Sequence, residues 1–77
     1  MVLMKIYYRN RWGETSVGIY FTIQGAKVGM GKKASNGWYV EAIHAIGPDE
    51  ERKKAIKAIT DWAEKQGLIW PPRGLEE

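Results

Sequence analysis

The chain has 77 residues, no cysteine and a formal net charge of +3. A chain this short has room for one thin hydrophobic core and no second domain. The absence of cysteine excludes disulfide bonds and thiolate metal sites as supports of that core. The four Trp, four Tyr and one Phe remain as a source of stability, together with self-association, so a monomer and a homodimer are equally open.

Two strands joined by a turn are predicted at the start of the chain, over residues 2–9 and 15–24. Both segments alternate with period two, which is typical of half-buried strands. In the first segment, the face expected to be buried carries Met4, Ile6 and Tyr8. In the second, it carries Val17, Ile19, Phe21 and Ile23. The turn between them contains Asn and Gly and places Trp12 at its tip.

Two further strands are predicted before Gly47. Gln24 and Gly25 interrupt the alternation and favour a tight turn, which leads into a strand over residues 26–31. An Asn-Gly pair at positions 36 and 37 is a strong hairpin signal and precedes a fourth strand over residues 38–46. Both faces of this strand are apolar near its end. That end is therefore either central in the sheet or covered by the tail or by a second subunit.

An amphipathic helix is predicted after Gly47. Pro48 and the three acidic residues that follow it are typical of a helix start, because carboxylates complement the positive end of the helix dipole. Apolar residues then recur at spacings of three and four as far as Ala63, and Gly67 is placed to end the helix. The expected fold class is α+β, with a four-stranded antiparallel meander and one C-terminal amphipathic helix packed on one face (ββββα).

The expected domain organisation is a single α+β domain over residues 1–70 and an extended C-terminal tail over residues 71–77. The segment Trp70, Pro71, Pro72 and Arg73 favours a polyproline-like conformation. It could bind in a groove of a partner protein, or it could lie back across its own sheet. The longest apolar stretches are shorter than the roughly 18–20 residues that cross a bilayer. With no secretory leader recognised, we expect a cytoplasmic location and no membrane partner.

The sequence offers little for catalysis. The predicted sheet contains His44, Glu14 and Glu41 among scattered Lys and Arg, and no nucleophile stands beside a base. His44 is the single histidine, so it has no histidine partner for a metal site, and we expect a structural role at the edge of the core. We therefore expect no enzymatic activity, no cofactor and no metal.

The positive charge belongs to the first half of the chain. Residues 1–46 contain six Lys or Arg and two acidic residues, a net charge of +4, whereas the remainder has a net charge of −1. On the predicted polar face of the sheet, aromatic rings alternate with basic side chains. Single-stranded nucleic acid is bound by this combination, because bases stack on rings and phosphates attract Lys and Arg. The residues assigned to this site are Lys5, Tyr7, Arg9, Arg11, Tyr20, Lys27, Lys32, Lys33 and Tyr39.

Other interpretations of this face stay open. Duplex phosphates could lie along a rim of Arg9, Arg11, Lys32 and Lys33, and an exposed Trp12 beside the arginines would favour nucleic acid of either form. The alternative function is a protein-interaction or inhibitor module, since Tyr and Arg are also enriched in protein interfaces. The predicted strand order is similar to that of small sheet-based nucleic-acid binders and of inhibitors encoded by phages or mobile elements. A face with no ligand is the third alternative, because Tyr, Thr and Lys suit solvated strands.

Overall fold

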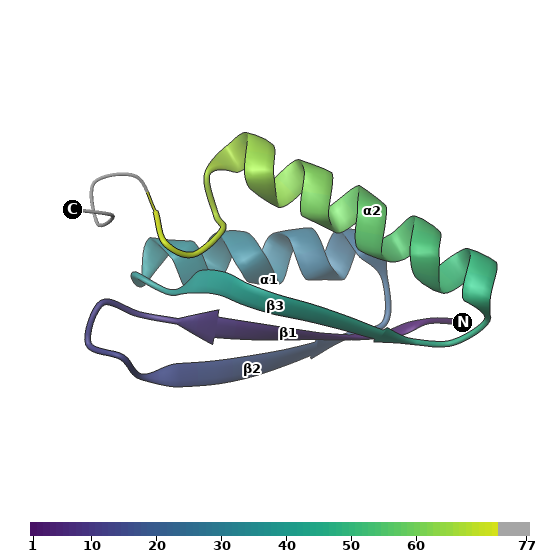
Figure 1. The fold of residues 1–77 in the computed structure, drawn as a ribbon, viewed down its shortest axis with the longest axis horizontal. Helices are drawn as coiled ribbons and strands as arrows, with labels where there is room; N and C mark the ends of the chain where they lie inside the picture. Colours follow the sequence, from purple (N-terminus) through teal and green to yellow (C-terminus); the bar gives the residue numbers. More distant parts are fainter. Residues whose placement is uncertain (73–77) are drawn as a thin grey trace.

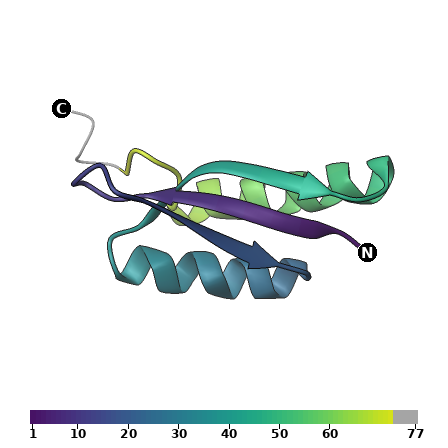
Figure 2. The same ribbon diagram turned by 90° about the horizontal axis from the view of Figure 1, so that it is seen from below.

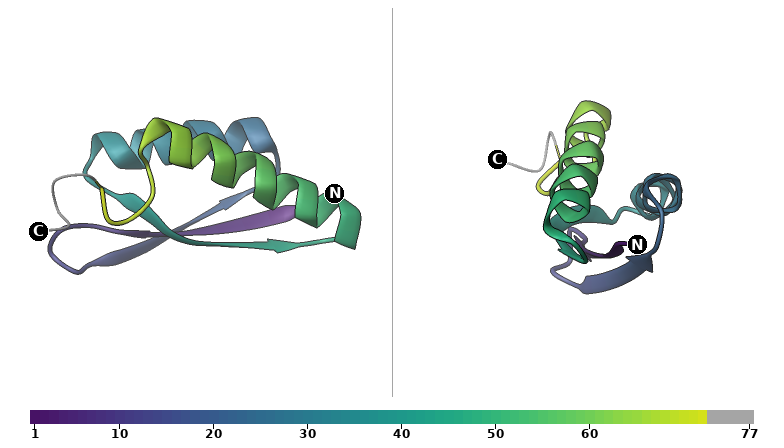
Figure 3. Two further views of the ribbon diagram at one scale, coloured as in Figure 1. Left: turned by 45° about the horizontal axis from the view of Figure 1, so that its top comes forward. Right: turned by 90° about the vertical axis from the view of Figure 1, so that its right-hand side faces the viewer.

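The computed structural model describes residues 1–72 (Figure 1). The elements in chain order are β1 (Leu3–Arg9), β2 (Thr15–Tyr20), α1 (Ile23–Ser35), β3 (Tyr39–Ile46) and α2 (Asp49–Gln66). The strands form a three-stranded antiparallel sheet in the order β2-β1-β3. Both helices lie on one face of this sheet, and Figure 2 looks at the other, uncovered face (Figures 1 to 3). No helix within the described range is long and apolar enough to cross a membrane.

The prediction of a four-stranded sheet with a single helix is wrong. The segment predicted as the third strand belongs to helix α1, so the order of elements is ββαβα. Ala26 and Met30 are buried and lie one helical turn apart, so these residues fit a period of two and a period of 3.6 equally well. At the N-terminus of this segment Thr22 favours the helix, because its Oγ accepts a hydrogen bond from the Gly25 N–H at 2.9 Å and caps the helix. The glycines of α1 have low helix propensity and therefore concealed it.

A bulge in β3 explains why this strand is apolar on both faces. Val40 and Ala42 pair with consecutive residues of β1, so Glu41 is an extra residue between them. The alternation changes phase at this point, and Val40 before the bulge and Ile43 after it both pack toward the helices. His44 consequently lies exposed on the uncovered face, and not at the edge of the core as predicted.

The predicted C-terminal helix is confirmed as α2. Its first turn carries three acidic residues, and it ends at Gly67, which adopts the left-handed conformation with φ 72°. Its buried stripe packs against α1 and β3. The buried apolar residues of the molecule are Met4, Ile6, Tyr8, Ala26, Met30, Val40, Ala55, Ile59 and Ala63.

The segment after α2 lies along the outer edge of β3 (Figure 1). The Val40 N–H donates to the Leu68 carbonyl at 2.7 Å, and the Trp70 N–H donates to the Val40 carbonyl at 2.7 Å. These bonds form a parallel bridge between Val40 and Ile69. Of the two arrangements considered for the tail, the structure shows that the chain lies back on its own sheet as far as Trp70. The contact is at the start of β3 and not at the apolar end of that strand. Partner binding by Trp70, Pro71 and Pro72 stays a prediction, and Arg73 lies outside the described residues.

Candidate nucleic-acid interface

The two faces of β2 are reversed relative to the prediction. Val17 and Ile19 are 49% and 51% exposed on the uncovered face of the sheet. Tyr20, predicted to stack on a ligand there, packs on the helix side, where its hydroxyl hydrogen-bonds to the Tyr8 hydroxyl at 2.8 Å. A Cβ added to Gly18 or to Gly29 would overlap Tyr20, so the two glycines make room for this side chain between β2 and α1. Tyr20 therefore occupies the helix side of β2, since it is larger than Val17 or Ile19 and its hydroxyl has a hydrogen-bond partner there.

Tyr8 is the most strongly perturbed titratable group of the described residues. Its side chain is fully buried in the core. Burial raises the pKa of Tyr8 far above its ordinary value of 10.0, and the hydrogen bond and charge of Tyr20 act in the same direction. Tyr8 is therefore a neutral structural phenol and not an acid or base available for proton transfer.

The raised pKa of Tyr8 predicts a loss of stability at alkaline pH. Below about pH 10 the phenol is protonated in both states, and the contribution of Tyr8 to stability is complete. At higher pH the unfolded chain loses a proton that the folded protein keeps, so the free energy of unfolding falls by up to about 1.4 kcal/mol per pH unit. Urea unfolding between about pH 9 and about pH 11 measures this slope. The Tyr8→Phe variant should show a shallower decline, and equal slopes would contradict the assignment.

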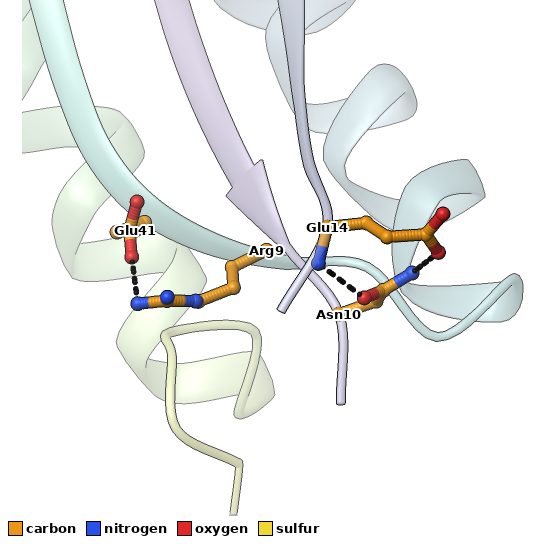
Figure 4. Close-up of polar contacts among 4 residues, drawn as sticks. All are labelled: Arg9, Asn10, Glu14 and Glu41. Carbon is orange, nitrogen blue, oxygen red and sulfur yellow. Dashed lines mark hydrogen bonds and ion pairs between the residues drawn. The ribbon is translucent and has the colours of Figure 1, made fainter. Parts of the chain in front are cut away.

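The predicted site residues lie on different sides of the molecule. The uncovered sheet face holds Lys5, Tyr7, Arg9 and Tyr39, the hairpin between β1 and β2 holds Arg11, and helix α1 holds Lys27, Lys32 and Lys33. The charge available on the sheet face is reduced, because Arg9 donates to the Glu41 carboxylate at 2.8 Å (Figure 4). The arginine also lies 5.9 Å from the ring centre of Trp70. The predicted flat basic-aromatic surface is therefore not assembled on the sheet.

The hairpin after β1 is held by Asn10, which is buried. Its Oδ1 accepts a hydrogen bond from the Glu14 N–H at 3.0 Å, and its Nδ2 donates to Glu14 Oε1 at 2.7 Å (Figure 4). The same Oδ1 also accepts from the Trp12 N–H at 3.0 Å. The turn presents Trp12, which is 75% exposed. The Arg11 guanidinium lies 5.6 Å from the centre of the Trp12 ring. An exposed Trp12 beside Arg9 and Arg11 was expected to favour nucleic acid, and the structure places Arg11 there but Arg9 at Glu41 and Trp70.

The last turn of α1 brings lysines to the same end of the molecule (Figure 1). The Lys33 ammonium lies 5.4 Å from the Trp38 ring centre and 5.5 Å from that of Tyr8, and it donates to Ser16 Oγ at 3.0 Å. Within residues 1–72, neither Lys32 nor Lys33 forms an ion pair with a carboxylate. Helix α1 itself contains no acidic residue. Lys32 is therefore an exposed positive charge, whereas the half-buried Lys33 ammonium is held by Ser16 and the two rings.

A hollow of about 320 Å³ opens beside these lysines. The residues that line it are Tyr20, Gly29, Lys32, Lys33, Asn36 and Trp38. We use the name hairpin-end surface for this hollow's basic rim together with the tip of the hairpin. Its members are Arg11, Trp12, Lys32, Lys33, Asn36 and Trp38.

The sequence prediction named Arg11, Lys32 and Lys33, but it assigned Trp38 to core or turn packing and did not group Trp38 and Asn36 with the two lysines. The signal was present, since Trp38 follows Lys33 by five residues. It was hidden because residues 26–31 were predicted as a strand, which gives the lysines a different direction from the one they have on a helix. Trp12 was recognised as informative if exposed.

No protein-family model matches this chain, and comparisons with curated proteins and with solved structures also found no match. Within the described part of the chain, no group of three or more His, Asp or Glu side chains is placed to hold a metal ion. The geometry of the surfaces is therefore the basis for any proposal about function.

Proposed function

We propose that the protein binds nucleic acid through the hairpin-end surface. The observation that supports this proposal is the pair Lys32 and Lys33, which have no carboxylate partner among residues 1–72 and lie at the rim of a hollow walled by Trp38. Unpaired lysines attract phosphates, and exposed aromatic rings stack on bases. Both requirements are met at one end of the molecule.

The residues of this surface divide into two roles. Arg11 and the exposed Lys32 contact phosphates, and Lys33 adds a charge at the mouth of the hollow. Trp12 stacks on an unpaired base, because its side chain lies at the hairpin and is 75% exposed. A ring that needs an unpaired base favours single strands over duplexes, so the preferred ligand is single-stranded DNA or RNA.

Fluorescence anisotropy with labelled single-stranded and duplex oligonucleotides tests this proposal. Binding should weaken strongly between about 50 mM and about 200 mM salt, because bound phosphates release counterions. Trp12→Ala should lower the affinity for single strands about tenfold or more, since stacking on one ring contributes about 1–3 kcal/mol. Lys32→Gln should weaken binding to all sequences and reduce the salt dependence by about one phosphate contact.

Two matched variants serve as controls for the anisotropy measurement. Lys54→Gln removes an exposed positive charge from α2, far from the proposed site, and should leave the affinity unchanged. Lys5→Gln removes a charge from the uncovered sheet face. A loss of binding in Lys5→Gln with none in Lys32→Gln would move the site to the sheet. The absence of salt-sensitive binding by the wild type would contradict the proposal.

A second candidate function, a protein-interaction module, is supported by the uncovered face of the sheet. Val17 and Ile19 point away from the helices, and Phe21 after the end of β2 is 58% exposed. We call these three residues the β2 stripe. Contiguous exposed apolar side chains of this kind are typical of protein-binding surfaces. The nucleic-acid proposal does not use any of them, so the two functions are separable by mutation.

A further inference from the structure

We infer that the partner of the uncovered sheet face is a second copy of this chain, which adds to the free edge of β2. The inference rests on the second candidate function, because it names the partner of the β2 stripe. It does not depend on nucleic-acid binding, which uses the hairpin-end surface and none of the residues of the β2 stripe.

The two outer edges of the sheet differ. The edge of β3 is occupied at Val40 by the segment Leu68–Trp70 of the same chain. The other edge strand, β2, has β1 as its one neighbouring strand among the described residues. The outer side of β2 therefore presents backbone donors and acceptors that no other strand of the described chain uses.

The hydrogen-bond pattern identifies these outward groups. The Asn10 N–H donates to the Glu14 carbonyl at 3.1 Å, which makes these two residues a hydrogen-bonded pair at the base of the hairpin. Such pairs alternate along an antiparallel ladder, so the residues of β2 an odd number of positions from Glu14 direct their backbone groups outward. These residues are Thr15, Val17 and Ile19. The backbone groups and the apolar side chains available for binding thus belong to the same residues.

Edge β2 has none of the usual protection against pairing. Natural sheets guard a free edge with Lys, with Pro, with a bulge or with a covering segment. Residues 15–26 contain no charged residue and no proline, and the bulge and the covering segment of this sheet are both on β3. The rest of the first half of the chain is basic, so β2 is the part at which two positively charged copies meet without direct repulsion.

A second copy fits this edge because an antiparallel pair of identical strands is self-complementary about a two-fold axis. In the register that places Val17 opposite Ile19 of the other copy, outward backbone groups meet outward backbone groups. The β2 stripes of the two copies then lie side by side on one continuous face and shield each other from water. Strand β2 is 6 residues long, so the paired edge is short and we expect a weak dimer with a dissociation constant on the order of 10 µM.

Sedimentation velocity over about 5–500 µM protein tests this inference, since a dissociation constant on the order of 10 µM lies inside that range. The wild type should shift from the 8.8 kDa monomer to a dimer as its concentration rises. Ile19→Lys places like charges next to each other across the two-fold axis and should keep the protein monomeric throughout. Val28→Lys changes an equally exposed apolar residue on α1 and should leave the dimer intact. Far-UV circular dichroism verifies that both variants are folded.

Amide hydrogen exchange locates the contact. Exchange at Val17 and Ile19 should slow at high protein concentration, because pairing engages their N–H groups. A dimer without this protection would overturn edge pairing in favour of stacked faces. A wild type that stays monomeric would overturn the inference altogether.

A fluorescent dye that binds apolar surfaces separates failure of this inference from failure of the protein-interaction function. Suppose that the wild type is monomeric and binds the dye, and that Ile19→Lys abolishes dye binding. This result would overturn the second copy as partner, but the uncovered face would remain a docking surface for another protein. A monomer that binds no dye would overturn both.

Discussion

Replacing Gly29 by alanine should destabilise the protein by about 1–3 kcal/mol, whereas the same change at Gly31 should stabilise it by about 0.5–1 kcal/mol. Both glycines lie within α1, where alanine has the higher helix propensity. At Gly31 a Cβ meets no other atom within 4 Å, so the gain in propensity is realised. At Gly29 the Cβ overlaps the Tyr20 ring, which the hydrogen bond to Tyr8 holds in place.

Urea unfolding of the two variants measures these opposite effects. A double-mutant cycle supplies the control, because Gly29→Ala should become neutral or stabilising once Tyr20 is also replaced by alanine. Stabilisation by Gly29→Ala in the otherwise unchanged protein would show that Tyr20 does not pack against the helix.

Replacing Tyr20 by alanine should lower the free energy of unfolding by about 3 kcal/mol, since the change removes a ring packed between β2 and α1. Ile19→Ala should cost less than about 0.5 kcal/mol, because the Ile19 side chain is half exposed on the uncovered face. The sequence-based prediction, in which Ile19 is buried and Tyr20 is exposed, expects the larger loss of stability in Ile19→Ala. The comparison therefore tests which face of β2 packs against the helices.

This measurement is made by chemical denaturation at a few micromolar protein, at about or below the expected dissociation constant of a dimer, so that self-association contributes little to stability. Tyr39→Ala provides a matched tyrosine control on the sheet face opposite the helices. A greater loss of stability in Ile19→Ala than in Tyr20→Ala would contradict the observed orientation of the strand.

Local signals in the sequence were sufficient for the first hairpin and for α2. The Asn and Gly of the hairpin turn, the alternation of β1 and the acidic first turn of α2 each specify their structure without reference to distant residues. Helix α1 could not be predicted in the same way. Its glycines oppose helix formation locally, and Gly29 is needed for a contact with Tyr20, which lies on another element. Tertiary packing outweighs local propensity at this position.

The same argument applies to β2 and β3. Val17 and Ile19 alternate with residues that include Tyr20, and the sequence does not show which side α1 will cover. In β3 the extra residue Glu41 changes the phase of the alternation, and a single sequence contains no mark of a bulge. The faces of both strands therefore depend on pairing and packing that act only in the folded chain.

The candidate site was predicted in its components but not in its grouping. The basic residues Arg11, Lys32 and Lys33 were named from the sequence, and the structure brings the two lysines together with Trp38. Tyr20 was assigned to the same surface as Tyr7, but the two residues lie on opposite faces of the sheet. Residues 26–31 were predicted as a strand but belong to helix α1, and this one error changed which side chains were expected to share a surface.

The parallel bridge between Val40 and Ile69 limits how far the protein can assemble. A sheet with two free edges can accept a copy at each of them and grow into a fibre. Here the chain's own segment pairs with β3 at Val40, so a copy that adds to this edge cannot use the start of the strand. Two copies joined through β2 therefore meet an obstacle to further strand addition at β3, which disfavours growth into a fibre.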